Sequence, residues 1–383
     1  MNFDLTDDQR MLVDSVATFV KKDSPISRFR AVREDEHGIG WSRDVLKKMG
    51  ELGWLGLIFP EAVGGLGGSC IDLALVLEQL GTALVPEPIL SSIVLGGLAV
   101  LRAGESKQHE RWLPALIAGD KTLALAITED DSRYDLHRIG TRAERTDGGY
   151  RLNGKKRFVL DGHTADAFVV SARTFGSVAD PEGVSLFVVD REGEGVTVQR
   201  IKTMDGHQAA IVSFDGAKIE TDRRLGQEGN ALATLESVID YAAACACAEG
   251  VGIMSTVLMM TRDYLCQREQ FGVKIGTFQA LQHSAVDMFV ETELARSTMI
   301  LGALGADEKD EQRRKRSVSA AKVQLATGGR FVTQQSIQLH GGIGITDEHD
   351  VGIYFKRMHV LNALFGDEEH HLRRFASLPG FAA

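Results

Sequence analysis

The sequence predicts an α+β protein with an N-terminal helical domain, a middle antiparallel β-barrel domain and a C-terminal bundle of long helices. Apolar residues recur at helical spacing through residues 1–120, short β-rich segments fill residues 121–227, and a helical period returns over residues 228–383. Because helices and strands occur in separate runs, the pattern favours three domains with these bounds over an alternating α/β fold.

The N-terminal region carries helix-start and helix-stop signals. Thr6 and Gln9 fit a capping box. Val16, Phe19 and Val20 then fall on one helical face. The same pattern recurs in SRDVLKKMGELG, IDLALVLEQLGTAL and ESKQHERWLPALIAG, separated by the Gly- and Pro-containing stretches AVGGLGGS and VPEP. We therefore expect this domain to be entirely helical.

The middle region reads as a series of hairpins. Its candidate strands are TLALAIT, GTRAERT, YRLNG, KRFVL, AFVVSART, VSLFVVD, VTVQRI and AAIVSF. The turn signals between them include Asp147-Gly148-Gly149 and Asn153-Gly154. No helical pattern separates the strands, which predicts an antiparallel barrel or sandwich and argues against a dinucleotide-binding α/β unit.

The C-terminal region contains long helical patterns at residues 231–265, 278–305 and 313–340 whose apolar residues cover much of the circumference, as in a bundle. The chain then reaches LFGDEEHHLRRF, in which Asp367 is expected to cap a helix. His370 and His371 are adjacent and would point about 100° apart on that helix, so we expect no metal site there.

Composition bounds the function. The chain has 383 residues, 44% apolar content and a net charge of −10, which argues against a nucleic-acid partner. The N-terminus lacks the pattern of an export signal, and the longest apolar run, SSIVLGGLAVL, is well short of the roughly 18 residues of a membrane span, so we expect a cytoplasmic protein without membrane contact. Cys70, Cys245, Cys247 and Cys266 lack zinc spacing and are expected to be buried, reduced thiols.

Two stretches carry a family resemblance. No G-x-x-x-x-G-K-[ST] phosphate loop is present, and LHGGIGIT does not follow a strand as a dinucleotide motif should. QREQFGVKIGTFQALQHSAVDM (267–288) and SIQLHGGIGITDEHDVGIYFKR (336–357), together with ITEDD at 127–131, resemble the acyl-CoA dehydrogenase family over essentially the whole chain. Within that family the chain is most similar to the small subunits of heteromeric bacterial enzymes such as pimeloyl-CoA dehydrogenase.

The resemblance implies an activity and partners. Family members are FAD-dependent oxidoreductases that introduce a double bond between the α and β carbons of an acyl-CoA thioester, a step of fatty-acid β-oxidation. They work as oligomers, so we expect a homodimer or homotetramer, or a hetero-oligomer with a homologous subunit. Electron-transfer flavoprotein is the expected electron acceptor.

The resemblance also implies FAD contacts. The first stretch would place an arginine, an aromatic ring and an amide against the FAD of a neighbouring subunit, and glycines in the second would let the backbone approach the pyrophosphate. The matching residues are Arg268, Phe271, Gln279, Gln338, Gly341 and Gly342.

The middle domain matches the family less completely. Thr128 occupies the place of the threonine that reaches the flavin, and Phe158 stands for the tryptophan that covers its far face. Tyr134 replaces the serine that contacts the acyl-CoA, and Asp130 replaces the proline of that motif. Leu160 lacks the hydroxyl that the family places two residues after the aromatic ring. Tyr134 is one expected substrate contact.

Asp240 is a second expected substrate contact, on the first long C-terminal helix. The acyl group itself is poorly indicated. The small residues AAACACA at 242–248 fit a wide or long acyl chain, although helix packing explains such a run about as well.

The family's catalytic glutamate is missing. The reaction needs a carboxylate to remove the α-proton, and the family places it directly before a glycine that matches Gly366. The residue there is Phe365, and the alternative position used by some members matches Ala242. Glu249 lies about two helical turns beyond Ala242 and is the best candidate for a substitute base. A carboxylate paired with an arginine, or one capping a helix, is the competing interpretation of Glu249.

Asp367, one residue beyond Gly366, is a weaker candidate for the base and a stronger one for a polar contact to the flavin. Three functions remain open. The chain could belong to a heteromeric dehydrogenase in which a homologous partner supplies the glutamate, which we favour. It could instead be a non-catalytic structural subunit, or a flavin oxidase or monooxygenase on the same fold.

Overall fold

A computed structural model describes residues 4–380, which fall into two compact units. The helical unit contains the residues up to Glu34, Ser69–Val85 and the residues from Ala243 onward. The β unit contains Asp35–Gly68 and Pro86–Ala242. Helix α7 (Leu232–Gln267) contributes its first turns to the β unit and the rest to the helical unit.

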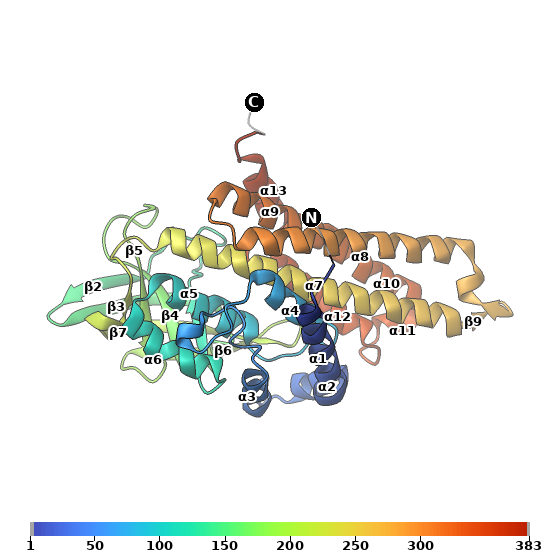
Figure 1. Cartoon of the computed structure of the whole chain (residues 1–383), viewed down its shortest axis with the longest axis horizontal. Coiled ribbons are helices and arrows are strands. Elements are labelled where there is room, and N and C mark those ends of the chain that lie inside the picture. The colour runs from blue at the N-terminus through green and yellow to red at the C-terminus, as the bar shows by residue number, and fades with distance from the viewer. Residues whose placement is uncertain (1–3, 381–383) are drawn as a thin grey trace. The chain divides into compact units, whose positions relative to one another are not determined.

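The helical unit consists of long helices with short connections (Figure 1). Its elements are α1 (Asp7–Asp23), α2 (Ile26–Glu34), α4 (Cys70–Gly81), the rest of α7, β9 (Glu269–Gln270), β10 (Val273–Lys274), α8 (Gln279–Ala306), α9 (Glu311–Gln324), α10 (Arg330–His340), α11 (Gly342–Ile345), α12 (Val351–Ala363) and α13 (Glu368–Ala376). A π-helical turn, Leu325–Gly329, joins α9 to α10, so the pattern predicted over residues 313–340 is nearly continuous helix.

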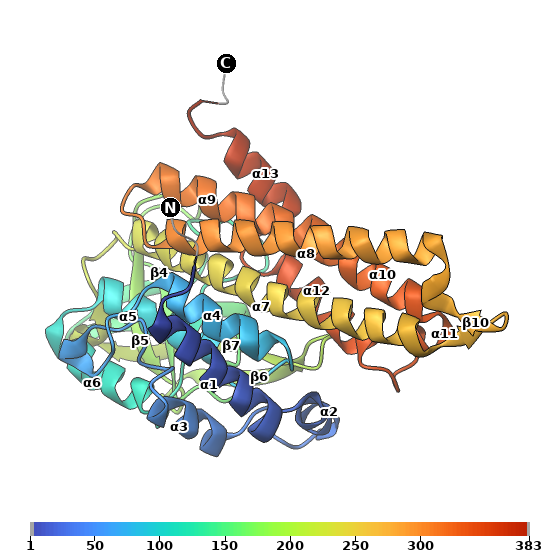
Figure 2. The same ribbon diagram turned by 45° about the vertical axis from the view of Figure 1, so that its right-hand side comes forward.

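Local signals fix the ends of these helices. The predicted capping box is confirmed, because Thr6 and Gln9 bond reciprocally at the start of α1. Asp367 is confirmed as the N-cap of α13, where its side chain accepts from the His370 amide. Helices α8 and α9 lie side by side in Figures 1 and 2, and a Cβ at Gly302 of α8 would meet the Cβ of Ala321 at 2.7 Å. Glycine therefore allows this close helix approach.

The β unit combines a sheet with short helices. The helical elements are α3 (Arg43–Glu51), a π-helix (Ile89–Gly97), α5 (Leu98–Ala103), α6 (Ser106–Ile117) and two 3-10 turns (Glu61–Val63 and Thr221–Arg223). The strands are β1 (Leu123–Ala126), β2 (Arg142–Thr146), β3 (Gly149–Leu160), β4 (Ala167–Arg173), β5 (Val184–Asp190), β6 (Val196–Lys202), β7 (Gln208–Glu220) and β8 (Arg224–Leu225). They pair in the order β6-β7-β3-β2-β4-β5-β8, and β1 pairs with β4.

Two sequence expectations about this sheet were wrong. The sheet is not wholly antiparallel, since β1 and the first residue of β2 pair parallel with β4. Asn153-Gly154 does not form a turn but lies within β3, where the register with β7 shifts. The Asn153 side chain accepts from the Gly216 amide of β7 at 2.7 Å, so pairing across the sheet overrides the local turn preference.

The core of the β unit lies against the inner strands. All residues of β4 are buried, and Phe168 on β4 and Phe187 on β5 are fully enclosed. The π-helix covers β1 closely, because a Cβ at Gly96 would lie 2.6 Å from the Cβ of Leu123. A strand buried on both faces reads as a continuous apolar run, which explains the sequence AFVV.

One helix of the described part of the chain, α7, is long and apolar enough to cross a membrane by length and composition. Its most apolar window is 67% buried inside the protein, as in the core helix of a globular fold. Cys70, Cys245 and Cys247 are free thiols buried inside the protein, as expected from the sequence. Cys266 is exposed near the C-terminal end of α7, so the expectation that all four thiols are buried was wrong for that residue.

Candidate cofactor and substrate site

Thr128 and Phe158 lie close together in the β unit. The Arg157 amide donates to the Thr128 carbonyl at 2.8 Å, which joins the segment after β1 to the end of β3. The register of β3 against β7 shifts between Lys156 and Val159, and Phe158 takes a left-handed conformation with φ of 51°. A bulge of this kind re-aims a side chain, and Phe158 is 39% exposed.

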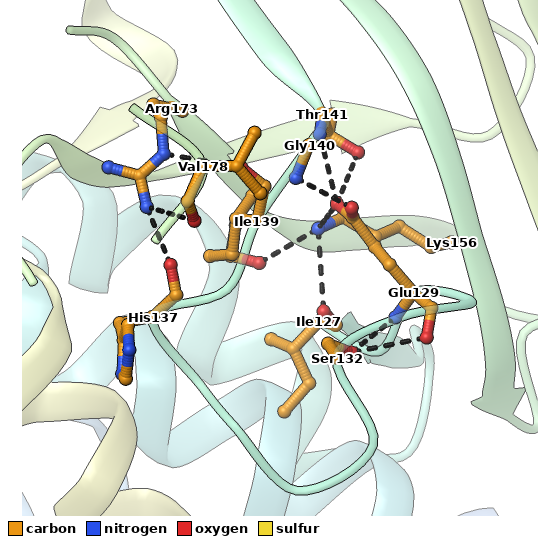
Figure 3. Close-up of polar contacts among 11 residues, drawn as sticks. Ile127, Glu129, Ser132, His137, Ile139, Gly140, Thr141, Lys156, Arg173 and Val178 are labelled. Carbon is orange, nitrogen blue, oxygen red and sulfur yellow. Dashed lines mark hydrogen bonds and ion pairs between the residues drawn. The ribbon is translucent and has the colours of Figure 1, made fainter. Parts of the chain in front are cut away.

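A buried ion pair joins Glu129, the residue after Thr128, to Lys156, two residues before Phe158 (Figure 3). The Lys156 side chain on β3 is fully buried, and its Nζ donates to Glu129 Oε1 at 2.7 Å and to Ser171 Oγ at 3.0 Å. Glu129 also accepts from the Gly140 amide at 2.7 Å and from the Thr141 amide and hydroxyl at 3.0 and 2.7 Å. The carboxylate therefore connects the two ends of residues 129–141.

The electrostatics of this pair follow from burial. Desolvation lowers the pKa of Lys156 to about 8, although the Glu129 carboxylate opposes the shift. Burial raises the pKa of Glu129, but the Lys156 charge and the hydrogen bonds lower it by more, so the net shift is downward. Both groups carry their charges at neutral pH.

Arg173, at the end of β4, holds the far half of the same loop (Figure 3). Its guanidinium is completely buried and donates to five backbone carbonyls. The accepting carbonyls and their distances are His137 at 2.5 Å, Ile139 at 3.2 Å, Val178 at 3.1 Å, Asp180 at 3.0 Å and Glu182 at 2.7 Å. Tyr134, the expected substrate contact, lies within this loop, half-buried, with the Arg133 guanidinium 5.2 Å from the centre of its ring.

The first C-terminal stretch predicted to contact FAD forms a hairpin in the helical unit. Arg268 follows α7, and its backbone carbonyl accepts from the Ile275 amide at 2.9 Å, which closes the β9–β10 turn. Phe271 sits in that turn with φ of 55° and is 91% exposed, and its ring centre lies 6.2 Å from that of Phe278. Gln279 begins α8 and is exposed. The hairpin thus presents a cation, a ring and an amide on the surface.

The second stretch predicted to contact FAD lies against the end of α7, just before the first stretch, through an aromatic contact. The Arg268 amide donates to the Tyr264 carbonyl at 2.8 Å, and the Tyr264 ring lies 4.6 Å from that of His340. His340 is buried, and among the described residues its Nε2 has no hydrogen-bond partner. Gly341 follows with φ of 64°, and a Cβ on Gly341 or Gly342 would meet nothing within 4 Å.

Exposed Gln338 completes this second set two residues before the end of α10. Asp240, in contrast, is 1% exposed on α7 within the β unit. Ala242 is likewise fully buried, so the alternative base position is filled by helix packing.

Glu249 is held in an ion pair. Its carboxylate accepts from Arg357 at two points, Nε to Oε1 at 2.6 Å and Nη2 to Oε2 at 3.0 Å. The two side chains are 13% and 9% exposed. This bidentate arrangement matches the competing interpretation of Glu249 as a paired carboxylate, and its role as a base stays a prediction.

Phe365 lies between α12 and α13, where neighbouring side chains hold its backbone in place. Its φ is 59°, which a non-glycine residue adopts only when its surroundings hold it there. Lys322 donates to the Leu361 and Leu364 carbonyls at 2.8 and 2.7 Å, and His371 Nε2 donates to the Phe365 carbonyl at 3.0 Å. Two buried side chains therefore fix the backbone around Phe365, where the sequence motif predicts the family glutamate.

Comparison with known proteins identifies the family. Sequence profiles described as the N-terminal, middle and C-terminal domains of acyl-CoA dehydrogenase match residues 6–120, 124–217 and 231–377. The chain belongs to the acyl-CoA dehydrogenase family. Members of this family are oxidoreductases that act on CH–CH bonds, and the family generally binds FAD. The helical, sheet and helical domain order expected from the sequence is confirmed.

Individual relatives cover nearly the whole chain. A mitochondrial 2-methylacyl-CoA dehydrogenase of Solanum tuberosum is 30% identical over 91% of this chain and 84% of its own length. Butyryl-CoA dehydrogenase from Megasphaera elsdenii has a TM-score of 0.89 at 26% identity, over 98% of this chain and 99% of that one. A chain of the ChsE4–ChsE5 complex from Mycobacterium tuberculosis has a TM-score of 0.87 at 27% identity, over 99% and 100%.

The residues present fit FAD. An exposed ring at Phe271, open space beside Gly341 and Gly342, and an unpaired buried nitrogen on His340 offer stacking, close backbone approach and a hydrogen bond. The individual contacts remain predictions. Sequence reasoning missed Lys156, although it shares the inward side of β3 with Tyr150 and Leu152 and so carried a period-2 signal.

Proposed function

We propose that this chain is the FAD-binding subunit of a heteromeric acyl-CoA dehydrogenase whose catalytic glutamate comes from a homologous partner chain. The proposal is carried by Phe365, which precedes Gly366 where the sequence motif predicts the family base. Glu249, the best substitute within the chain, has both carboxylate oxygens engaged by Arg357. An ion-paired carboxylate is a poor proton acceptor at the α-carbon, because the guanidinium stabilises its charged form.

The proposed chemistry divides between cofactor, chain and partner. When bound, FAD supplies the hydride acceptor for the β-carbon. This chain's residues bind and orient: Arg268 would pair with the pyrophosphate and Phe271 would stack on the adenine. Thr128 would hydrogen-bond the flavin, and Phe158 would exclude water from its far face. The partner's glutamate would take the α-proton.

The helical unit offers a surface for such a partner. An apolar face on α8 is exposed, and its residues are Val286 at 56%, Phe289 at 54%, Val290 at 46%, Leu294 at 47%, Leu301 at 48% and Leu304 at 45%. They lie on one side of the helix at its 3.6-residue period. An exposed apolar strip of this kind marks a protein interface. A homologous chain, with the same helix, is the occupant we propose.

A related assembly supports a partner that is not a second copy. The similar chain of ChsE4–ChsE5 belongs to a complex of two named components. We propose the same kind of pairing here, with electron-transfer flavoprotein as the acceptor. The likeness to the small subunit of pimeloyl-CoA dehydrogenase remains a prediction at this level.

Co-purification tests the proposal. The chain would be expressed alone and together with the product of a neighbouring acyl-CoA dehydrogenase gene, and the mass and flavin absorbance of each preparation measured. We expect a hetero-oligomer that retains FAD. The double variant Phe289→Asp/Leu294→Asp on the α8 apolar face should prevent assembly. The control, Val178→Asp on an exposed turn of the β unit, should assemble normally. A homo-oligomer without flavin would instead indicate a structural subunit.

A further inference from the structure

Two short segments that carry the predicted flavin contacts are tied together three times within the β unit. The Arg157 amide donates to the Thr128 carbonyl at 2.8 Å. Lys156 Nζ donates to Glu129 Oε1 at 2.7 Å. Arg157 also pairs with Asp130, with Nε 2.6 Å from Oδ1. Thr128 and Phe158 each lie next to one of these links, so their separation is set by them.

Glu129 also closes the loop 129–141 at its two ends, which we call the neck of the loop. Its carboxylate accepts from the backbone amides of Gly140 and Thr141, so one side chain joins the first residue of the loop to the last two. The Glu129 amide in turn donates to Ser132 Oγ at 2.8 Å. The ends of this loop are therefore closed by side-chain contacts, as in an Ω-loop, and Tyr134 lies on it.

The Lys156 ammonium has no solvent contact. Its other hydrogen bonds go to Ser171 Oγ at 3.0 Å and the Ile127 carbonyl at 3.4 Å, so each of its three hydrogens has a partner (Figure 3). Burying two charges costs free energy that their attraction regains only with good geometry, and apolar pairs of similar volume are often at least as stable. Stability alone therefore does not account for an ion pair here.

We propose that Lys156 and Glu129 are positioning residues for cofactor binding: their ion pair closes the neck of the loop 129–141 and fixes Thr128 relative to Phe158. This inference rests on the proposed FAD binding and deepens it. The pair touches neither cofactor nor substrate. It acts through the backbone that presents Thr128 and Tyr134 on one side and through the bulge that presents Phe158 on the other.

The test is a double variant that removes both charges and keeps the side-chain volumes, Glu129→Gln/Lys156→Met. Removing both avoids the unpaired buried charge that would unfold a single variant. The matched control is Glu194→Gln/Lys218→Met, an exposed Lys–Glu pair of the same unit with 3.1 Å between Nζ and Oε2. A milder second variant, Thr141→Val, removes one hydrogen bond to Glu129 and leaves both charges in place.

Three quantities would be measured on the full chain: the dissociation constant for FAD, the visible spectrum of the bound flavin, and amide hydrogen exchange at Gly140 and Thr141. In the double variant we expect FAD affinity to fall about tenfold or more. A fall of this size equals the net contribution of one or two hydrogen bonds, which is what we expect when the contacts that hold the site in place are lost. The spectrum should shift and the two amides should exchange about tenfold faster. Thr141→Val should change all three in the same direction by less, and the control should change none.

The outcomes separate the two claims. If the double variant exchanges faster but binds FAD with unchanged affinity and spectrum, the pair only stabilises the loop and the positioning role is wrong. Unchanged exchange also overturns it, because the neck would then be closed without the pair. If the wild-type chain, alone and with its partner, binds no FAD, the proposed function itself fails, and the positioning role fails with it.

Discussion

Lys322 Nζ lies 2.7 Å from the carbonyl oxygen of Leu364, the residue directly before Phe365. The lysine is fully buried, and this desolvation lowers its pKa to about 8. Its second contact, to the Leu361 carbonyl at 2.8 Å, holds the last turn of α12. An ammonium group inside the helical unit therefore fixes the backbone that leads to position 365, although that position carries no base.

Because the backbone at residue 365 is already held in place, we predict that a glutamate introduced there gives this chain the activity of a catalytic base. In Phe365→Glu, a carboxylate would stand where the family places its glutamate, on a backbone already held at φ of 59°. We expect the variant chain alone to reduce its bound flavin with a saturated acyl-CoA about 10²–10⁴-fold faster than the wild type, the usual contribution of a positioned base. Stopped-flow flavin bleaching without oxygen measures it.

Phe365→Gln is the matched control, because a glutamine side chain has nearly the same shape as a glutamate but cannot accept the α-proton. It should stay as slow as the wild type. Equal rates for the Glu and Gln variants would mean that position 365 does not face the α-carbon, and would contradict the proposed assignment of the missing base.

Removing the ammonium should loosen the same segment. In Lys322→Met, the Leu361 and Leu364 carbonyls lose their buried donor, which costs about 1–3 kcal/mol in the free energy of unfolding. Relief of the buried charge offsets part of this cost. Urea unfolding of this variant and of Lys309→Met, an exposed lysine expected to change stability by less than about 0.5 kcal/mol, gives the comparison. Indistinguishable stabilities would show that Lys322 does not support position 365.

His371 predicts a pH dependence with a definite sign. Burial, and then the nearby positive charge of Lys322, lowers the pKa of His371 to about 2, whereas an unfolded histidine titrates near 6.5. As pH falls below about 6.5 the unfolded chain binds a proton that the folded chain does not, so the free energy of unfolding decreases. This stabilising contribution is fully present above pH 6.5.

His371→Asn should remove that part of the slope while lowering stability at pH 7.5, where the hydrogen bond to the Phe365 carbonyl is lost. Denaturant unfolding of both proteins between pH 5 and 7.5 measures the difference. If the free energy of unfolding changed with pH in the same way in both proteins, His371 would be protonated in the folded protein, contrary to its burial.

The Glu249–Arg357 pair separates structural from catalytic roles. Removing only one partner would leave a buried charge unpaired and cost about 3–5 kcal/mol. The double variant Glu249→Gln/Arg357→Met removes both charges and should remain folded. Because we assign the base to the partner chain, we expect the assembled double variant to reduce its flavin at the wild-type rate. Loss of reduction with FAD still bound would make Glu249 the base.

Helix periodicity predicted the helices because each buries a continuous face, as Val16, Phe19 and Val20 do on α1. The turn expected at Asn153-Gly154 failed because pairing with β7 competes with the local turn preference. The parallel pairing of β1 with β4 was equally hidden, since it joins segments about forty residues apart that carry no register signal of their own.

The site divides in the same way. The assignment of Phe365 to the base position rests on a motif alone, because Phe365 stands directly before a glycine that matches the motif, and it stays a prediction. The ion pair of Lys156 with Glu129 could not be predicted, because the lysine is fully buried against the usual exposure of its type and its partner comes from another segment. Backbone strain at Phe158 and Phe365 depends on contacts that only the folded chain contains.

Anaerobic mixing with an acyl-CoA tests the central claim most directly, with flavin absorbance followed for this chain alone and for its complex with the homologous subunit. Our account predicts that the chain alone binds FAD and acyl-CoA but leaves the flavin oxidised, and that the complex bleaches it. Rapid bleaching by the wild-type chain alone would contradict the account, because a base within this chain would then be removing the α-proton.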